Sequence, residues 1–263
     1  MKRIIIPSLL FAPIMLAVIA NFLILFPINK DVFSSISYYM LFCTYLSLIT
    51  LIALETENLS YYNIDRGTLG VALIFGLFRI SRKGMEGEVF YQIATFVITL
   101  PLIYISIKNW QKIPSLNIGW ALIGLLTCLL IPALIWLDSL DIRKYAQQTF
   151  SYSLELEIFR GIVENLSFTT IREEVLMRGL LLGYLKTRGW EENKGLMLQF
   201  FVFWLLHFWQ IFYYPLSFLV GLPIVILILT LLVKYSKQIF PSLIFHTMLN
   251  SLDSILGVIF TRQ

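Results

Sequence analysis

The sequence predicts an all-α fold, a polytopic membrane bundle with about seven to eight transmembrane helices at roughly 20 residues per span. Two features of composition support this prediction. Of the 263 residues, 58% are hydrophobic and only 14% are charged, whereas a soluble domain carries roughly 25% charged residues. The mean hydropathy is +0.80. A third observation is that long apolar runs recur along the chain, which leaves no room for a sizeable soluble domain.

The first half contains four clear spans, each bounded by charged or proline-containing loops: Ile4–Phe26, Ile36–Leu54, Val89–Ile107 and Ile118–Leu137. The first span exceeds the roughly 7–15 apolar residues of a secretory signal, so we expect a retained membrane helix. A shorter apolar run, Leu69–Phe78, is either interfacial or a tilted span.

The second half contains four apolar helices, and three of them hold ionisable side chains: Leu166–Tyr184, Gly195–Phe212, Leu216–Val233 and Ile239–Phe260. Ionisable groups at membrane depth cost roughly 2.5–3.5 kcal/mol each, so they are rarely kept without a use. We therefore divide the chain into N-terminal transmembrane helices over residues 1–150, without a recognisable motif, and a helical core over residues 151–263, in which any chemistry is expected to lie.

Charge and cysteine content narrow the partners. The net charge of +4 is typical of basic loops at lipid headgroups and does not require a nucleic acid partner. Cys43 and Cys128 lie inside apolar runs and are predicted to be packing residues. We expect a multi-pass protein of a prokaryotic plasma membrane, because the chain is small and has no eukaryotic targeting tail. Lysine and arginine divide too evenly between the two sides to fix its orientation.

The helix predicted over Leu166–Tyr184 carries Glu173, Glu174 and Arg178 in an apolar sequence. Glu174 and Arg178 are four residues apart, which stacks them on one face in the favourable order for an ion pair. Glu173 points about 100° away from that face. An isolated carboxylate in a low dielectric becomes neutral, so Arg178 can keep Glu174 charged. The alternative is an ordinary ion pair on a solvated helix, which the apolar flanks make less attractive.

The only two histidines of the chain lie on two other apolar helices. His207 shares a face with Phe203, four residues earlier, and His246 shares a face with Asn250, four residues later. Each set could instead be a structural hydrogen-bonding seam between membrane helices.

Depth in the membrane favours one shared site. At about 1.5 Å per residue, Glu173 and His207 both lie about 18 Å along their helices from the Lys186–Lys194 loop. His246 lies about 9–10 Å from the Lys234–Gln238 loop, which is predicted to be on the same side. All three groups can therefore meet at roughly mid-depth.

Such a site has the groups needed for peptide-bond hydrolysis. Glu173 with His207 can remove a proton from water, which then attacks an amide carbonyl. His246 and Asn250 carry donors that can hold the developing oxyanion. Two imidazoles and a carboxylate could instead hold a zinc ion. Because no HExxH pairing is present, we expect no cofactor and keep zinc as the minority alternative.

In chain order, the motifs Glu173-Glu174-x-x-x-Arg178-Gly179, Phe203-x-x-x-His207 and His246-x-x-x-Asn250 resemble those of the CPBP family. This is the CAAX-protease and bacteriocin-processing (Abi) family of intramembrane glutamic endopeptidases. The resemblance covers about residues 166–260. Members that process prenylated CAAX proteins open their cavity toward the cytoplasm, which would place the Lys186–Lys194 loop inside.

The resemblance implies a role for each motif residue and a peptide or lipidated protein as substrate. Glu173 and His207 would activate the water. Glu174 and Arg178 would orient the site and balance its charge. His246 and Asn250 would stabilise the oxyanion.

Two other functions remain open at this point. The same polar cavity would suit a non-catalytic immunity or peptide-binding protein of the membrane. A small transporter could use Asp253 and the two histidines as a proton relay. Clustering of the polar groups in one half, without visible repeat symmetry, disfavours the transporter.

Overall fold

The computed structural model describes residues 2–23, 30–54, 118–134, 170–212 and 214–261, with the single residues 100, 162 and 165. Every regular element within these ranges is helical, which agrees with the predicted all-α class. The predicted segment Leu69–Phe78 and, apart from Leu100, the predicted span Val89–Ile107 lie outside the described residues.

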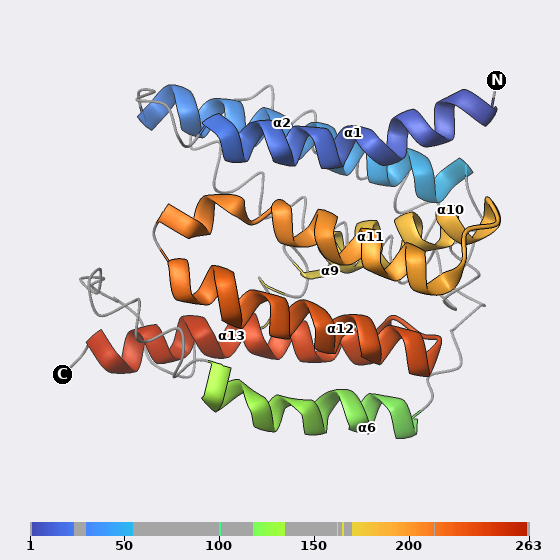
Figure 1. Cartoon of the computed structure of the whole chain (residues 1–263). Helices are drawn as coiled ribbons and strands as arrows, with labels where there is room; N and C mark the ends of the chain where they lie inside the picture. The colour runs from blue at the N-terminus through green and yellow to red at the C-terminus, as the bar shows by residue number, and fades with distance from the viewer. Residues whose placement is uncertain are drawn as a thin grey trace.

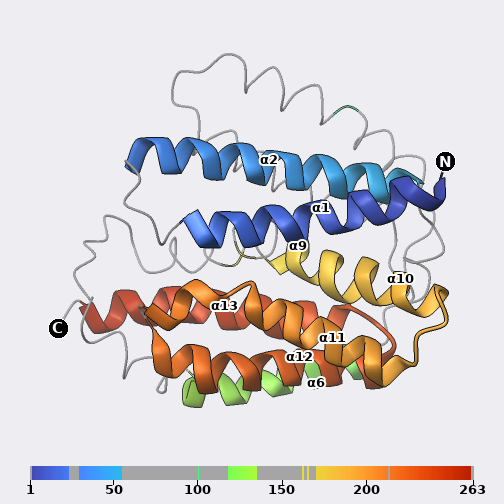
Figure 2. The same cartoon turned by 45° about the horizontal axis from the view of Figure 1, so that its top comes forward.

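Two long helices form one side of the molecule. Helices α1 (Lys2–Leu23) and α2 (Lys30–Leu54) pack against each other. They match the first two predicted spans, with ends that differ by a few residues. Figures 1 and 2 show them as a layer beside the helices of the second half. Apolar side chains from both layers join in one core, which includes Leu10, Tyr45, Leu48, Leu180 and Phe203.

The opposite side is formed by α6 (Ile118–Thr127), which continues through the 3-10 turn η1 (Cys128–Leu130). Helix α6 packs against α13 (Phe240–Thr261), and Figure 1 shows it running below the pair of helices α12 and α13. Gly124 allows this close approach, because a Cβ atom there would lie 2.6 Å from the carbonyl oxygen of Pro241. The start of α13 is therefore fixed against α6 by backbone packing.

The central helices carry the first predicted motif. The chain passes from α9 (Ile171–Glu174) into a π-helical segment, η3 (Val175–Leu181), and then into α10 (Leu182–Thr187). Every side chain of η3 is buried. Gly189 has a φ of 80°, a left-handed conformation that glycine adopts without a steric cost. The chain can therefore reverse there into α11 (Glu192–Leu205).

His207 lies in a turn, although the sequence predicted a continuous helix over Gly195–Phe212. Helix α11 ends at Leu205, and the chain continues as a 3-10 helix, η4 (Phe208–Phe212). The N–H of Leu206 still bonds to the carbonyl four residues back, whereas that of His207 bonds to the carbonyl three residues back. The helix therefore tightens at the motif histidine.

The last two helices form an antiparallel pair (Figure 1). A second π-helical segment, η5 (Ser217–Gly221), leads into α12 (Leu222–Ser236). Lys237 closes α12 in a left-handed conformation, with its N–H bonded to the carbonyl of Val233. Helix α13 follows from Phe240.

Among the described residues, one helical stretch, Ser217–Ser236, is long and apolar enough to cross a membrane. Two shorter apolar helices cover Ile6–Ile19 and Ile118–Leu134. The predicted number of about seven to eight spans therefore stays a prediction.

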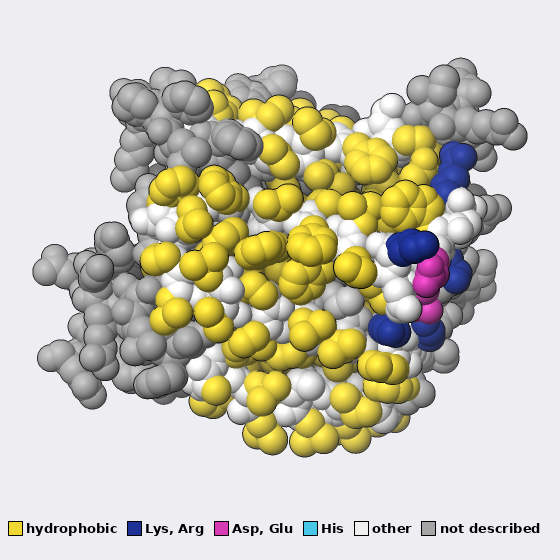
Figure 3. All heavy atoms as spheres, viewed as in Figure 1, with side chains coloured by type: hydrophobic (Ala, Val, Ile, Leu, Met, Phe, Trp, Pro, Cys, Tyr) yellow, Lys and Arg dark blue, Asp and Glu magenta, His cyan; other side chains and the backbone are white. Residues whose placement is uncertain are grey.

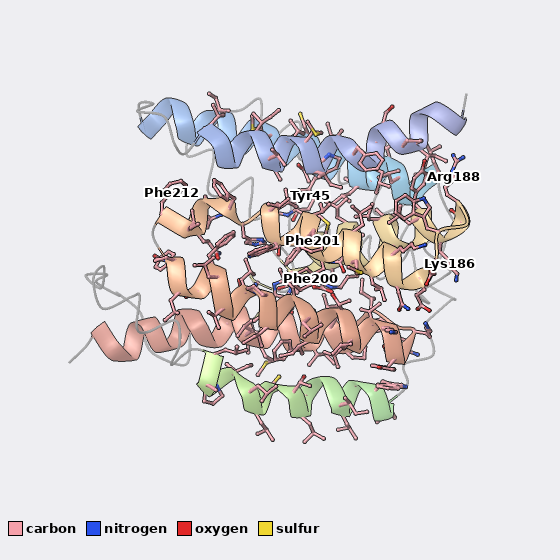
Figure 4. All side chains as sticks on the ribbon, in the orientation of Figure 1. Tyr45, Lys186, Arg188, Phe200, Phe201 and Phe212 are labelled. Atoms are coloured by element: carbon pink, nitrogen blue, oxygen red, sulfur yellow. The ribbon has the colours of Figure 1, made fainter. Side chains whose placement is uncertain are left out.

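The surface separates apolar and charged side chains. Hydrophobic side chains cover most of the described face in Figure 3, and the charged ones gather at one end. Figure 4 places Lys186 and Arg188 at that end, where α10 meets α11. We call this end the charged rim and define it by six described residues: Lys186, Arg188, Glu191, Glu192, Lys194 and Lys237. An apolar belt with a charged edge is typical of a protein at a membrane surface.

Candidate active site

Glu174 is the centre of a buried polar cluster. Its side chain is 0% exposed, and its Oε1 accepts hydrogen bonds from Arg178 Nη1 at 2.5 Å and His246 Nδ1 at 2.8 Å. Its Oε2 accepts a third bond, from Ser242 Oγ at 2.7 Å. Charge-assisted bonds of this kind hold a carboxylate in its ionised form. Because an ionised carboxylate has no proton to donate, Nδ1 of His246 must carry the proton of their shared bond.

Arg178 balances the charge of Glu174 inside the protein. The two residues form the i, i+4 ion pair that the spacing predicted, and both side chains are fully buried. The face of the Phe203 ring lies 4.9 Å from the guanidinium carbon, close enough for a cation–π contact. Among the described protein atoms, Nε and Nη2 of Arg178 have no hydrogen-bond partner. Glu174 and the aromatic ring therefore provide the electrostatic balance of this cation.

Glu173 faces a different environment from its neighbour. Its side chain is 17% exposed, and its Oε1 lies 3.2 Å from Arg172 Nη2. Its Oε2 lies 3.7 Å from Nε2 of His246. His246 thus lies between two carboxylates, with Nδ1 bonded to Glu174 and Nε2 turned toward Glu173. Of the two glutamates, Glu173 is the one that keeps some access to solvent.

Phe203 separates the two histidines. Its ring lies 4.8 Å from the His207 ring and 6.2 Å, nearly perpendicular, from the His246 ring. His207 Nδ1 lies 2.9 Å from the carbonyl oxygen of Phe203, on its own helix. In the described part of the chain, no hydrogen bond or ion pair joins Glu173 directly to His207. The three motifs therefore come together around Phe203 and His246.

Asn250 lies on α13, one helical turn beyond His246. Its side chain is half-buried, and it takes part in an interaction of its own. Gly179 is buried within η3. The described side chains include no group of three or more His, Cys, Asp or Glu that could hold a metal ion.

The sequence reasoning missed Ser242, although its spacing could have revealed it. Ser242 precedes His246 by four residues, so the two lie on one face of α13. Both contact the carboxylate of Glu174, at 2.7 and 2.8 Å. A search for polar residues one turn before each motif histidine would have found it.

The arrangement can transfer protons between Nε2 of His246 and Glu173, the glutamate that is partly exposed to solvent. His246 is anchored through Nδ1, which leaves Nε2 facing Glu173. That nitrogen accepts a proton when the imidazole is neutral and donates one when it is charged. A carboxylate and an imidazole that face one another in this way are suited to acid–base work on a water molecule.

Comparison with known proteins identifies the same part of the chain. Residues 157–252 match the family described as type II CAAX prenyl endopeptidase, Rce1-like. The match spans all three motifs, from Glu173 to Asn250. No curated protein and no solved structure matched the chain. The family consists of membrane proteases. Residues 157–252 are therefore similar to the Rce1-like type II CAAX prenyl endopeptidases of the CPBP family, the family that the three motifs resemble.

Proposed function

We propose that this chain is an intramembrane endopeptidase of the CAAX-protease type, which hydrolyses a peptide bond of a lipidated or otherwise membrane-associated protein. One observation carries the proposal: His246 lies between Glu174, at 2.8 Å, and Glu173, at 3.7 Å. This arrangement lies inside the segment that matches a protease family.

In the proposed reaction, Glu173 is the general base. It is the glutamate that solvent reaches, whereas both oxygens of Glu174 already accept bonds inside the protein. Glu173 takes a proton from a water molecule, and the water oxygen attacks the carbonyl carbon of the substrate. The proton then passes to the leaving amine as the carbon–nitrogen bond breaks. His207 is proposed to help orient the water from the other side of Phe203.

His246 and Asn250 are proposed to hold the oxyanion. Because Nδ1 of His246 donates to Glu174, the imidazole needs a second proton on Nε2 to act as a donor. The bond to Glu174 fixes the ring through Nδ1 and leaves Nε2 as the nitrogen that can serve as this donor. Arg178 in turn keeps Glu174 ionised, so the proposed role of the ion pair is to prepare His246 for the transition state.

The proposed location is a prokaryotic plasma membrane, which the chain crosses several times. The exposed apolar side chains of α11, η5 and α12 support contact with lipid; among them are Met197, Phe201, Leu205, Leu219 and Leu227. Four of the six residues of the charged rim are basic. This favours a cytoplasmic position for the rim under the positive-inside rule.

Replacing Glu173 by Gln tests the proposal directly. The full chain, reconstituted in liposomes, would be assayed with a quenched fluorescent peptide that is farnesylated on the cysteine of a C-terminal Cys-a-a-X sequence. We expect a rate loss of about 10²- to 10⁴-fold, the usual contribution of a general base. Glu191→Gln, on the charged rim, is the matched control and should keep the wild-type rate.

Full activity of Glu173→Gln would contradict the proposal. If the same variant also preserves the biological phenotype, the chain acts as the non-catalytic immunity or peptide-binding protein. Comparing N- and C-terminal peptides from membranes that contain the wild type or this variant would identify the natural substrate.

We propose hydrolysis without a resident metal, and a chelator tests this separately. The wild-type rate should survive a strong chelator. Loss of activity that zinc restores would favour the metalloprotease alternative.

A further inference from the structure

Ser242 contacts the proposed catalytic machinery through Glu174. Its side chain is fully buried, and Oγ lies 2.7 Å from Oε2 of Glu174. We propose that Ser242 is a positioning residue: it fixes the carboxylate of Glu174 so that His246 keeps its proton on Nδ1 and presents Nε2 to Glu173. The inference rests on the proposed function. It assigns the orientation of the Glu174 carboxylate to a residue outside the three motifs.

The hydroxyl of Ser242 has two acceptors within reach and one proton to give. Besides Glu174, the carbonyl oxygen of Ile239 lies 2.9 Å away. A bond to an ionised carboxylate is roughly twice as strong as one to a neutral carbonyl, so the proton belongs mainly to Glu174. Ser242 also lies in the first turn of α13, where the helix dipole favours a nearby negative charge.

The two oxygens of Glu174 are held by different partners. Arg178 and His246 both bond to Oε1, whereas Ser242 is the partner of Oε2. The terminal torsion of a glutamate is broad, so a carboxylate held through one oxygen can rotate. Ser242 removes that freedom and fixes the plane of the carboxylate against His246. Without Ser242, the carboxylate of Glu174 can take several orientations, and only some of them keep the bond to Nδ1 of His246.

The same helix offers a matched control. Ser251 is also buried, but its hydroxyl bonds to the carbonyl of Thr247 at 2.6 Å, within α13. Ser242→Ala and Ser251→Ala therefore remove the same group from one helix. They differ in whether the lost bond reaches Glu174.

Kinetics of the full chain in liposomes, with the farnesylated peptide, give the first readout. We expect Ser242→Ala to lower kcat about ten- to hundredfold, as for one lost bond to a charged group, with KM unchanged. Ser251→Ala should keep both constants, and Ser242→Thr, which retains a hydroxyl, should recover activity. In a Glu174→Gln background, Ser242→Ala should lower kcat little further, because both changes act through the carboxylate of Glu174.

Nitrogen NMR of ring-labelled histidine gives a readout that does not depend on activity. The chain has two histidines, so a spectrum of His207→Gln assigns the signals of His246. The wild type should show a protonated Nδ1, and Ser242→Ala a mixture of protonation at both nitrogens. Ser242→Cys, similar in size but a weak donor, replaces Ser242→Ala if the alanine variant does not fold.

An unchanged His246 spectrum in Ser242→Ala, or in Ser242→Cys if the alanine variant does not fold, would overturn the inference, even if the wild type cleaves peptides. An enzyme that cleaves no peptide would instead overturn the proposed function. The NMR comparison still reports the effect of Ser242 in that case.

Discussion

Charged side chains occur in two regions with opposite environments. The buried polar cluster, formed by Glu174, Arg178, Ser242 and His246, lies among apolar helices, and its ion pair is 0% exposed. On the charged rim, Lys237 is 49% exposed and Glu192 is 29% exposed, although they also form an ion pair. A contact between a carboxylate and a cation is therefore present both out of reach of solvent and exposed to it.

The difference decides what each contact contributes. A buried charge depends on its partner, because removing one partner leaves the other uncompensated in a low dielectric. A charge on the rim is hydrated and screened, so water and dissolved ions can compensate it when its partner is removed. The cluster can therefore hold the proposed catalytic groups in place, whereas the rim can vary with little effect on folding.

The largest expected effect follows from Arg178→Met. The change removes the cation and leaves Glu174 buried with His246 and Ser242 alone. We expect the free energy of unfolding in detergent to fall by about 3–5 kcal/mol, as for other broken buried pairs. Lys186→Met, on the charged rim, is the control for loss of a basic side chain. A loss below about 1 kcal/mol would contradict the dependence of the cluster on its partner charges.

A paired replacement sharpens the same test. Glu174→Gln together with Arg178→Met removes both charges and should recover much of the lost stability. Two polar atoms of Arg178 have no hydrogen-bond partner in the described structure, which adds to the cost of keeping this residue buried. Activity should stay low in the double variant, since His246 loses its charged partner.

The two regions also differ in how far the sequence predicts them. Apolar runs predicted the helices α1, α2, α12 and α13 with ends that differ from the structure by up to six residues, because long apolar runs favour long helices. The four-residue spacing predicted the Glu174–Arg178 pair, since neighbours on a helix face follow from its pitch. The turn at His207 was missed, because local hydrogen bonding rather than hydropathy sets where a helix tightens.

The depth argument predicted that Glu173, His207 and His246 share one site, but the individual contacts between distant segments were beyond the sequence pattern. Glu174 and His246 are 72 residues apart, and their contact depends on how α13 packs against the central helices. The different exposure of Glu173 and Glu174 has the same origin, since adjacent residues share one composition but point to different neighbours. The family resemblance supplied proposed roles for both, whereas the structure shows which one solvent reaches.

Gly124→Ala perturbs the connection between the two regions. Pro241 follows the rim residue Lys237 by four positions and directly precedes Ser242. The added Cβ atom would lie 2.6 Å from the carbonyl oxygen of Pro241, so α13 or α6 must shift. We expect a loss of about 1–3 kcal/mol in unfolding free energy, typical of overpacking. A fall in kcat should accompany it as Ser242 moves from Glu174.

Gly195→Ala is the matched glycine control near the rim. Its added Cβ would lie 3.8 Å from the side chains of Leu182 and Leu185, which is ordinary contact. Alanine is favoured over glycine in a helix by roughly 0.5–1 kcal/mol, so this variant should be slightly more stable than the wild type. Equal effects of the two glycine changes would contradict the tight packing of α6 on α13.

The smallest effect is expected from Glu192→Ala on the charged rim, which breaks the ion pair with Lys237. Exposed pairs contribute about 0.2–1 kcal/mol, and the Debye length falls to about 3 Å in 1 M salt. The loss in unfolding free energy should therefore be small and should nearly vanish at high salt. Glu191→Ala, which breaks the more exposed pair with Lys194, should lower the unfolding free energy by no more than this.

The effect of Arg178→Met should persist in the same salt, since ions do not reach the cluster. If salt instead reduced the losses from Arg178→Met and Glu192→Ala equally, the cluster would be open to solvent. Burial could then not explain how the cluster keeps His246 in position.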